Sequence, residues 1–137
     1  MNNIEMVKNH LEFYGYEFDE EYSDKDNHIA YSEKYGMISV RSFGENSNMG
    51  VRLDKYFPIN HIQSNDNKRI SLFDMINDMN RTIILGTVYL YEEEGMSFTS
   101  TILGEYDKKI FSEALEIFHL DCDTLYKYDL QEYWESN

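Results

Sequence analysis

Near the start of the chain, apolar residues recur every three to four positions. This spacing places them on one face of a helix, and they are Ile4, Val7, Leu11 and Tyr14. Asn2 or Asn3 can accept a hydrogen bond from the first turn and so cap the helix, and Gly15 suits its end. The pattern therefore predicts a short amphipathic helix.

From residue 16 to residue 53 the period falls to two residues, which is typical of strands with one buried face. Residues 16–27 hold six acids and three aromatics and predict an extended segment that runs into an acidic turn. Apolar alternation then follows in three stretches, at Ile29 and Tyr31, at Ile38 and Val40, and at Val51 and Leu53. Gly36 and residues 44–48 supply the turns, so a meander of three antiparallel strands is expected.

The middle of the chain predicts a loop followed by a second helix. Residues 58–67 begin with the single proline and are mostly polar, which favours a surface loop. Ser71 is then predicted to cap a helix that ends near Arg81. The apolar face of this helix holds Leu72, Met75, Ile76 and Met79.

The last third predicts a hairpin and a long helix. Residues 83–91 are rich in β-branched and aromatic side chains, residues 96–103 alternate, and residues 92–95 supply a charged turn. Asp107 can cap the helix that follows. Its sustained apolar stripe is formed by Ile110, Phe111, Ala114, Leu115, Phe118, Cys122 and Leu125.

Together the elements follow the order α-β-β-β-α-β-β-α. Strands grouped in antiparallel runs, with helices between the groups, predict an α+β fold, a two-layer sandwich in which helices pack on an antiparallel sheet. A chain of 137 residues has the common size of one domain, so residues 1–137 are expected to form a single domain.

Residues 76–81, Ile-Asn-Asp-Met-Asn-Arg, lead into the apolar stretch of residues 84–90, which is followed by a Glu/Gly turn and another strand. This segment and the order of elements are similar to the YbjN-like bacterial sensory-transduction-regulator family, over roughly residues 4–126. In that family a helix ending in an Asn-x-x-Asn or similar pattern precedes the β-hairpin. Asn77 and Asn80 occupy those places here.

The resemblance implies a fold and a mode of action but no site. The family shares its fold with type III secretion chaperones, so the resemblance implies non-enzymatic binding of other polypeptides, often by dimers. A homodimer is therefore one expectation. The family supplies no catalytic residues to carry over.

Acidic residues are concentrated at the two ends of the chain. The formal net charge is −14, and residues 1–35 carry nine acids and three bases, residues 36–83 five and six, and residues 84–137 twelve and three. Such a field repels nucleic acid and anionic membranes and attracts basic partners, although acidity can also serve solubility alone. We expect a protein partner, basic in character, with no nucleic acid and no membrane. Arg41 and Arg52 are expected to be neighbours on adjacent strands, where they would pair with acids.

The spacing of potential catalytic and metal-binding residues favours neither catalysis nor a cofactor. The seven glycines are dispersed, so no phosphate-binding loop is predicted. A calcium loop that started at Asp24 would need Gly and Glu where Ile29 and Tyr35 stand. We therefore expect no enzymatic activity, no cofactor and no dedicated metal centre. A weak cation site is an alternative among Asp19, Glu20, Glu21, Asp24 and Asp26.

His119 and Cys122 lie one helical turn apart and are the closest candidates for a reactive or metal-binding pair. Cys122 lies on the apolar stripe, so a packed thiol with a partly exposed imidazole beside it is expected instead. Asp121 and Asp123 flank the thiol, and nearby anions raise a thiol pKa and weaken the group as a nucleophile.

Several features predict a cytoplasmic protein. A single cysteine excludes an intrachain disulfide, and the first residues lack the charged and apolar regions of a signal peptide. No stretch of the sequence approaches 18 consecutive apolar residues.

Aromatic residues alternate with acids at two places, and tyrosine and tryptophan often anchor protein interfaces. The first group is Tyr16, Phe18, Glu20, Glu21 and Tyr22, and the second is Tyr128, Glu132, Tyr133 and Trp134. We expect these residues to bind the partner. For the C-terminal group, packing of the tail onto the domain is an equal alternative.

The leading hypothesis is a chaperone-like or regulatory domain that holds another polypeptide with a sheet face and an acidic rim. The alternative is an immunity protein, an antitoxin whose acidity complements a basic toxin such as a nuclease. An enzyme of unrecognised type is a third hypothesis, for which the sequence suggests no substrate.

Overall fold

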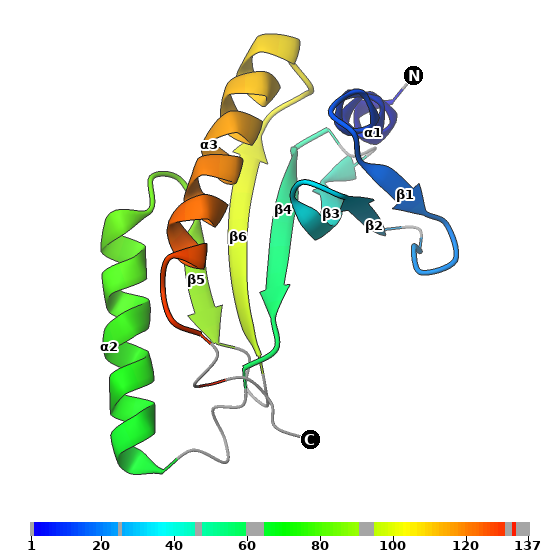
Figure 1. Cartoon of the computed structure of the whole chain (residues 1–137). Coiled ribbons are helices and arrows are strands. Elements are labelled where there is room, and N and C mark those ends of the chain that lie inside the picture. Colours follow the sequence, from blue (N-terminus) through cyan, green and yellow to red (C-terminus); the bar gives the residue numbers. More distant parts are fainter. Residues whose placement is uncertain are drawn as a thin grey trace.

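The computed structural model describes residues 2–24, 26–45, 48–59, 65–90, 95–130 and 133 (Figure 1). It confirms the predicted α+β class, with one more short strand before the second helix than the sequence pattern predicts. In chain order the elements are α1 (Asn3–Phe13), β1 (Glu17–Asp19), β2 (Asn27–Ser32), β3 (Gly36–Phe43), β4 (Gly50–Phe57), α2 (Asp66–Thr82), β5 (Thr87–Leu90), β6 (Met96–Leu103) and α3 (Lys108–Tyr126).

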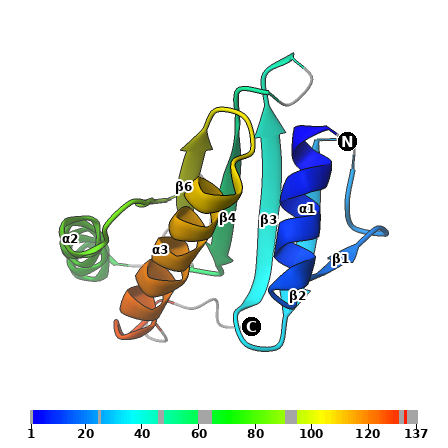
Figure 2. The same cartoon turned by 90° about the horizontal axis from the view of Figure 1, so that it is seen from above.

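The strands form one antiparallel sheet in the order β1-β2-β3-β4-β6-β5. β2, β3 and β4 make the predicted meander, and β5 and β6 pair as the predicted hairpin. Because β6 pairs with β4, β5 lies at one edge of the sheet and β1 at the other. Helices α1 and α3 lie on one face of the sheet, and α2 lies beside β5 (Figures 1 and 2). None of the described helices covers the opposite face, which we call the open face.

The core lies between the sheet and the helices. Phe118 of α3 stacks on Phe98 of β6 with ring centroids 5.3 Å apart, and both side chains are buried. Every residue of the predicted stripe on α3 is buried except Ile110, which is exposed. The wide stripe thus explains why the sequence pattern located this helix well.

The first and last helices begin at the predicted caps. The Asn2 side chain accepts a hydrogen bond from the Glu5 N–H at 2.9 Å, and the Asp107 carboxylate accepts one from the Ile110 N–H at 2.9 Å. These caps satisfy backbone donors that the helix itself leaves unpaired.

Helix α2 begins earlier than predicted, so the cap at Ser71 is wrong, and residues 66 and 67 belong to the helix and not to the predicted loop. Residues 60–64 of that loop lie outside the described residues. Asn65 is the cap, because its side chain accepts from the Lys68 N–H at 2.8 Å. Residues 65–70 are all exposed, so the first turns carry no apolar period that would reveal a helix. The Ser71 hydroxyl instead lies 2.7 Å from the Tyr133 hydroxyl, with which it shares a hydrogen bond.

The strand predicted from residue 83 begins only at Thr87, because a buried carboxylate holds the residues before it. Asp121 of α3 is 1% exposed. Its carboxylate accepts hydrogen bonds from three consecutive backbone N–H groups at 2.8, 3.0 and 3.4 Å. The donors are those of Ile84, Leu85 and Gly86. This contact fixes α3 to the connection between α2 and β5.

The side chain of Asn80 completes the edge of the sheet at β5. Its Oδ1 atom accepts from the Val88 N–H at 2.7 Å, and its Nδ2 atom donates to the Val88 carbonyl at 3.0 Å. A bare edge strand offers such groups to other chains. The second asparagine of the Asn77-x-x-Asn80 pattern therefore has a structural role, which is to occupy this position on the edge.

Candidate functional site

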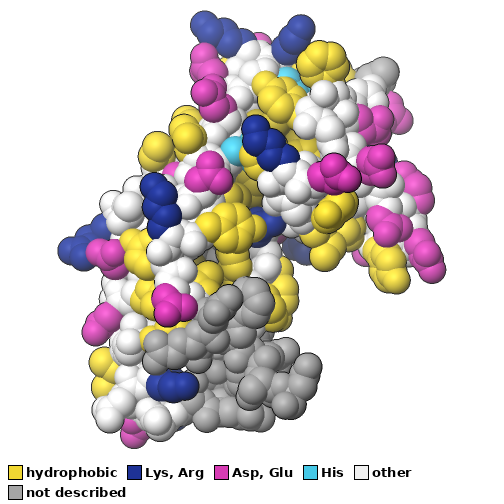
Figure 3. Space-filling view, viewed as in Figure 1, with side chains coloured by type: hydrophobic (Ala, Val, Ile, Leu, Met, Phe, Trp, Pro, Cys, Tyr) yellow, Lys and Arg dark blue, Asp and Glu magenta, His cyan; other side chains and the backbone are white. Residues whose placement is uncertain are grey.

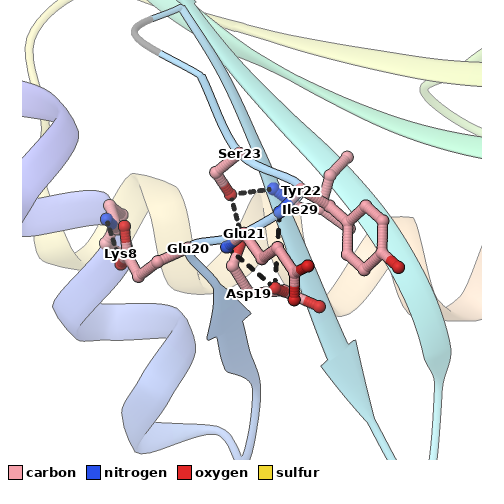
Figure 4. Close-up of polar contacts among 7 residues, drawn as sticks. All are labelled: Lys8, Asp19, Glu20, Glu21, Tyr22, Ser23 and Ile29. Carbon is pink, nitrogen blue, oxygen red and sulfur yellow. Dashed lines mark hydrogen bonds and ion pairs between the residues drawn. The ribbon is translucent and has the colours of Figure 1, made fainter.

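The acidic turn, residues 19–24, joins β1 to β2 and is held by its own polar side chains (Figure 4). The Asp19 carboxylate accepts from the N–H groups of Glu21 and Tyr22 at 3.0 and 3.4 Å. The Ser23 hydroxyl donates to the Asp19 carbonyl at 2.6 Å and accepts from the Ile29 N–H at 3.0 Å. The turn is therefore a built structure that presents its remaining side chains in fixed directions.

Most members of the first predicted group are accessible on this turn, but one is not. Glu20, Glu21 and Tyr22 are exposed, and Glu20 points toward Lys8 of α1 at 3.6 Å (Figure 4). Phe18 is half-buried, and the Lys8 ammonium lies over its ring, 5.0 Å from the centroid. Tyr16, in contrast, is 1% exposed and belongs to the core, so its ring does not reach a partner in this fold. Tyrosine suits both places, since it carries an apolar ring and a polar tip.

The described part of the second predicted group packs against α2. The Tyr128 hydroxyl donates to the Asp78 carboxylate at 2.6 Å, and this hydrogen bond lowers the pKa of Asp78. Tyr133 is buried and bonds to Ser71. Packing onto the domain is thus the role of Tyr133. Outside the described residues lie Glu132 and Trp134.

The fold separates the two predicted groups. The acidic turn extends from β1 at one edge of the sheet, whereas Tyr128 lies against α2, next to β5 at the other edge (Figure 1). One small partner surface does not include both groups.

The open face carries a row of exposed side chains that the sequence pattern misassigned. Tyr31 was expected to face the core with Ile29, but the buried residues of β2 are Ala30 and Ser32. Tyr31 pairs with Met37 across β2 and β3, and Tyr56 and Tyr89 flank Ser97 of β6 from its two sides. The exposed row, between 38% and 60% accessible, consists of Tyr31, Met37, Tyr56 and Tyr89.

A shallow depression of about 490 Å³ lies along this row, with Met37 and Tyr56 in its lining. Arg41 also lines it and is the direct cross-strand partner of Arg52, which confirms that the two arginines are neighbours. Like charges placed opposite each other destabilise a sheet slightly. Asp54 also lines the depression, which therefore carries charges of both signs.

His119 is buried, so the predicted partly exposed imidazole is wrong. The Tyr35 ring, which reaches it from the turn between β2 and β3, covers it in a parallel stack with centroids 3.6 Å apart. The Nε2 atom lies 2.8 Å from the Tyr16 hydroxyl, within a hydrogen bond. Burial lowers the pKa of His119 to about 4, so the imidazole is neutral at physiological pH.

Cys122 is buried as expected, and burial raises the pKa of its thiol to about 12. Asp123 and Asp121 add to this shift, while Lys55 opposes it. A thiol that stays protonated is a poor nucleophile. The geometry thus favours a packing role for Cys122.

Lys55 is a buried cation that ties the turn between β2 and β3 to β4. Its ammonium donates to the carbonyls of Tyr35 and Met37 at 2.8 and 3.2 Å and lies 5.7 Å from the Tyr126 ring centroid. These contacts hold Tyr35 in position over His119.

The part of the chain that the structure describes contains no cluster of three or more histidine, cysteine or acidic side chains that could hold a metal ion. None of its helices combines the length and the apolar character needed to cross a membrane.

A comparison with known protein families identifies a match over residues 3–130. The matching family is YbjN, described as "Putative bacterial sensory transduction regulator". Comparison with curated proteins gave no match. The matched range includes all the helices and strands described above. The chain therefore belongs to the YbjN family.

Proposed function

We propose that this chain is a non-enzymatic regulatory domain, chaperone-like in action, that holds another polypeptide on the open face of its sheet. The observation that carries this proposal is the exposed row. Isolated apolar side chains are normal on a protein surface, but a contiguous set is typical of an interaction site. Tyrosine and methionine are also enriched where proteins meet.

The charges around the exposed row specify the partner further. Glu17 of β1 pairs with Tyr31 at one end of the row, and the acidic turn follows directly. A complementary polypeptide would place apolar side chains over the row and a basic side chain at the β1 end. Such a segment would lie across the strands of the sheet.

The decisive experiment tests whether the partner contacts the open face or the helical side of the domain. A photo-reactive amino acid would replace Tyr56 in the full chain, expressed in its native cells, and mass spectrometry would identify the crosslinked polypeptide. Phe73, an exposed residue of α2, supplies the control position. We expect one dominant polypeptide from position 56 and none from position 73.

The complex would then be rebuilt from purified components. Met37→Ser combined with Tyr56→Ser should weaken binding at least tenfold, whereas Phe73→Ser should not. A crosslinked product that is a second copy of the chain would instead identify a homodimer. Equal capture from both positions, or unchanged affinity of the double variant, would refute the open face as the binding surface.

An immunity protein is the second candidate function, favoured by the acidic turn with its exposed Glu20, Glu21 and Tyr22. Exposed acids around an aromatic suit a basic toxin surface. Glu20→Gln with Glu21→Gln would then reduce the association rate, and about 0.5 M salt would abolish the effect by screening. Salt-independent binding by the open face would favour the first candidate.

A further inference from the structure

A pocket of about 410 Å³ lies between α1 and the first turns of α3, on the side of the sheet away from the open face. In Figure 3 hydrophobic side chains lie beside dark-blue basic ones over this upper end of the molecule. The volume falls in the range of sites for small ligands. It is therefore a candidate site separate from the proposed partner surface.

Aromatic rings form much of the lining of this pocket. Phe13 and Tyr14 line it at the end of α1, and Phe13 is 89% exposed, the largest exposure of any large apolar side chain described. The two rings meet edge to face with centroids 6.4 Å apart. The exposed phenylalanine ring leaves apolar surface in contact with water. A flat ligand in the pocket would cover that surface.

His10 lines the pocket with a fixed ring. It stacks on Tyr14 at 5.4 Å and meets Phe111 edge-on at 4.8 Å. Its Nδ1 atom lies 2.7 Å from the Tyr106 hydroxyl and its Nε2 atom 3.3 Å from the Ser112 hydroxyl. Both ring nitrogens thus have partners, and the pocket is preformed without its ligand.

The charge of the lining is positive in a strongly acidic chain. Lys108 lines the pocket, and none of the described residues around it is acidic, although the chain has 26 acids and only 12 lysines and arginines. Burial and the Lys108 charge both lower the pKa of His10, so the imidazole does not compete with Lys108 for an anion.

We propose that this pocket binds a small aromatic carboxylate. The aromatic ring of the ligand would lie against Phe13 and Tyr14, and its carboxylate would pair with the Lys108 ammonium. Aromatic contacts supply most of the affinity, and the lysine supplies the preference for an acid over a neutral analogue. A cationic ligand is disfavoured because the lining offers no carboxylate.

The test uses the full chain and three probes, benzoate, phenylacetate and indole-3-acetate, each with its matched neutral amide. Isothermal titration calorimetry gives the affinities, and amide chemical shifts locate the site. We expect at least one acid to bind about tenfold more tightly than its amide. The shifts should fall within residues 6–14 and 106–112.

Matched variants separate the contribution of the lysine charge to ligand affinity from that of the aromatic contact. Lys108→Met should remove the preference for the acid, Phe13→Ser should weaken acid and amide alike, and Lys109→Met, next to Lys108 but outside the lining, should change neither. The proposal is overturned if no acid binds at millimolar concentration, if acid and amide bind equally, or if the shifts lie elsewhere. Binding only of a peptide that ends in an aromatic residue would overturn it as well.

Discussion

The ring of Tyr35 lies parallel to the imidazole of His119, with their centroids 3.6 Å apart and their planes 3° from parallel. Burial disfavours the charged imidazolium. The pKa of about 4 in the folded chain lies below the ordinary value of 6.5. The unfolded chain therefore binds a proton at His119 more readily than the folded chain does.

This difference makes part of the stability depend on pH. The contribution of neutral His119 is fully present above pH 6.5 and falls by roughly 3 kcal/mol as the pH drops to about 4. Urea unfolding of the wild type and of His119→Gln would measure it as the difference between the two free energies of unfolding. Parallel pH profiles for the two proteins would contradict the expectation.

Cys122 should resist alkylation in the folded chain. A thiol pKa of about 12 in place of the ordinary 9 lowers the thiolate fraction at pH 8 roughly a thousandfold. Iodoacetamide labelling followed by mass spectrometry would measure the rate. Leu120→Cys in a Cys122→Ala background provides an exposed thiol on the same helix, and it should react at the rate of a free cysteine. Rapid labelling of Cys122 without denaturant would show that the thiol is accessible.

Removing the Asn80 amide should destabilise the domain and expose the backbone groups of β5 at the edge of the sheet. Asn80→Ala loses two hydrogen bonds to Val88, which corresponds to about 1–3 kcal/mol of unfolding free energy. The bare strand should also promote self-association, visible by size-exclusion chromatography with light scattering. Asn77→Ala, an exposed asparagine on the same helix, is the matched control. A stable, monomeric Asn80→Ala protein would argue against the edge role.

Asp121 should be more sensitive to substitution than its neighbour Asp123. An asparagine at position 121 would replace one acceptor oxygen by a donor that faces backbone N–H groups, with an expected loss of about 2–4 kcal/mol. Asp123→Asn changes an exposed side chain and should alter stability by less than about 0.5 kcal/mol. Hydrogen exchange of residues 84–86 should accelerate only in the first variant.

The sequence predicts elements well where burial imposes a period. The stripe on α3 is an example, since six of its seven residues are buried. The exposed first turns of α2 carry no such period and were missed. β1 lies in the predicted extended segment before the acidic turn, but it was not counted as a strand because only three of its residues pair, too few for an alternating pattern.

The candidate site was harder to predict because it depends on contacts between distant residues. Tyr16 was expected on the surface, but its hydroxyl meets His119, 103 residues later in the chain. Nothing local distinguishes a buried tyrosine from an exposed one. The assignment of Tyr31 to the core failed because Ala30, a small residue, is the side chain that α1 and its neighbours bury.

The packing of α1 against α3 also determines when the fold can be completed. The contacts of His10 with Tyr106 and Ser112, and of Tyr16 with His119, join residues 96 to 103 positions apart. During synthesis the N-terminal helix emerges first, and it lacks these contacts until the last helix has left the ribosome. The first helix of the nascent chain can therefore complete its packing only near the end of synthesis.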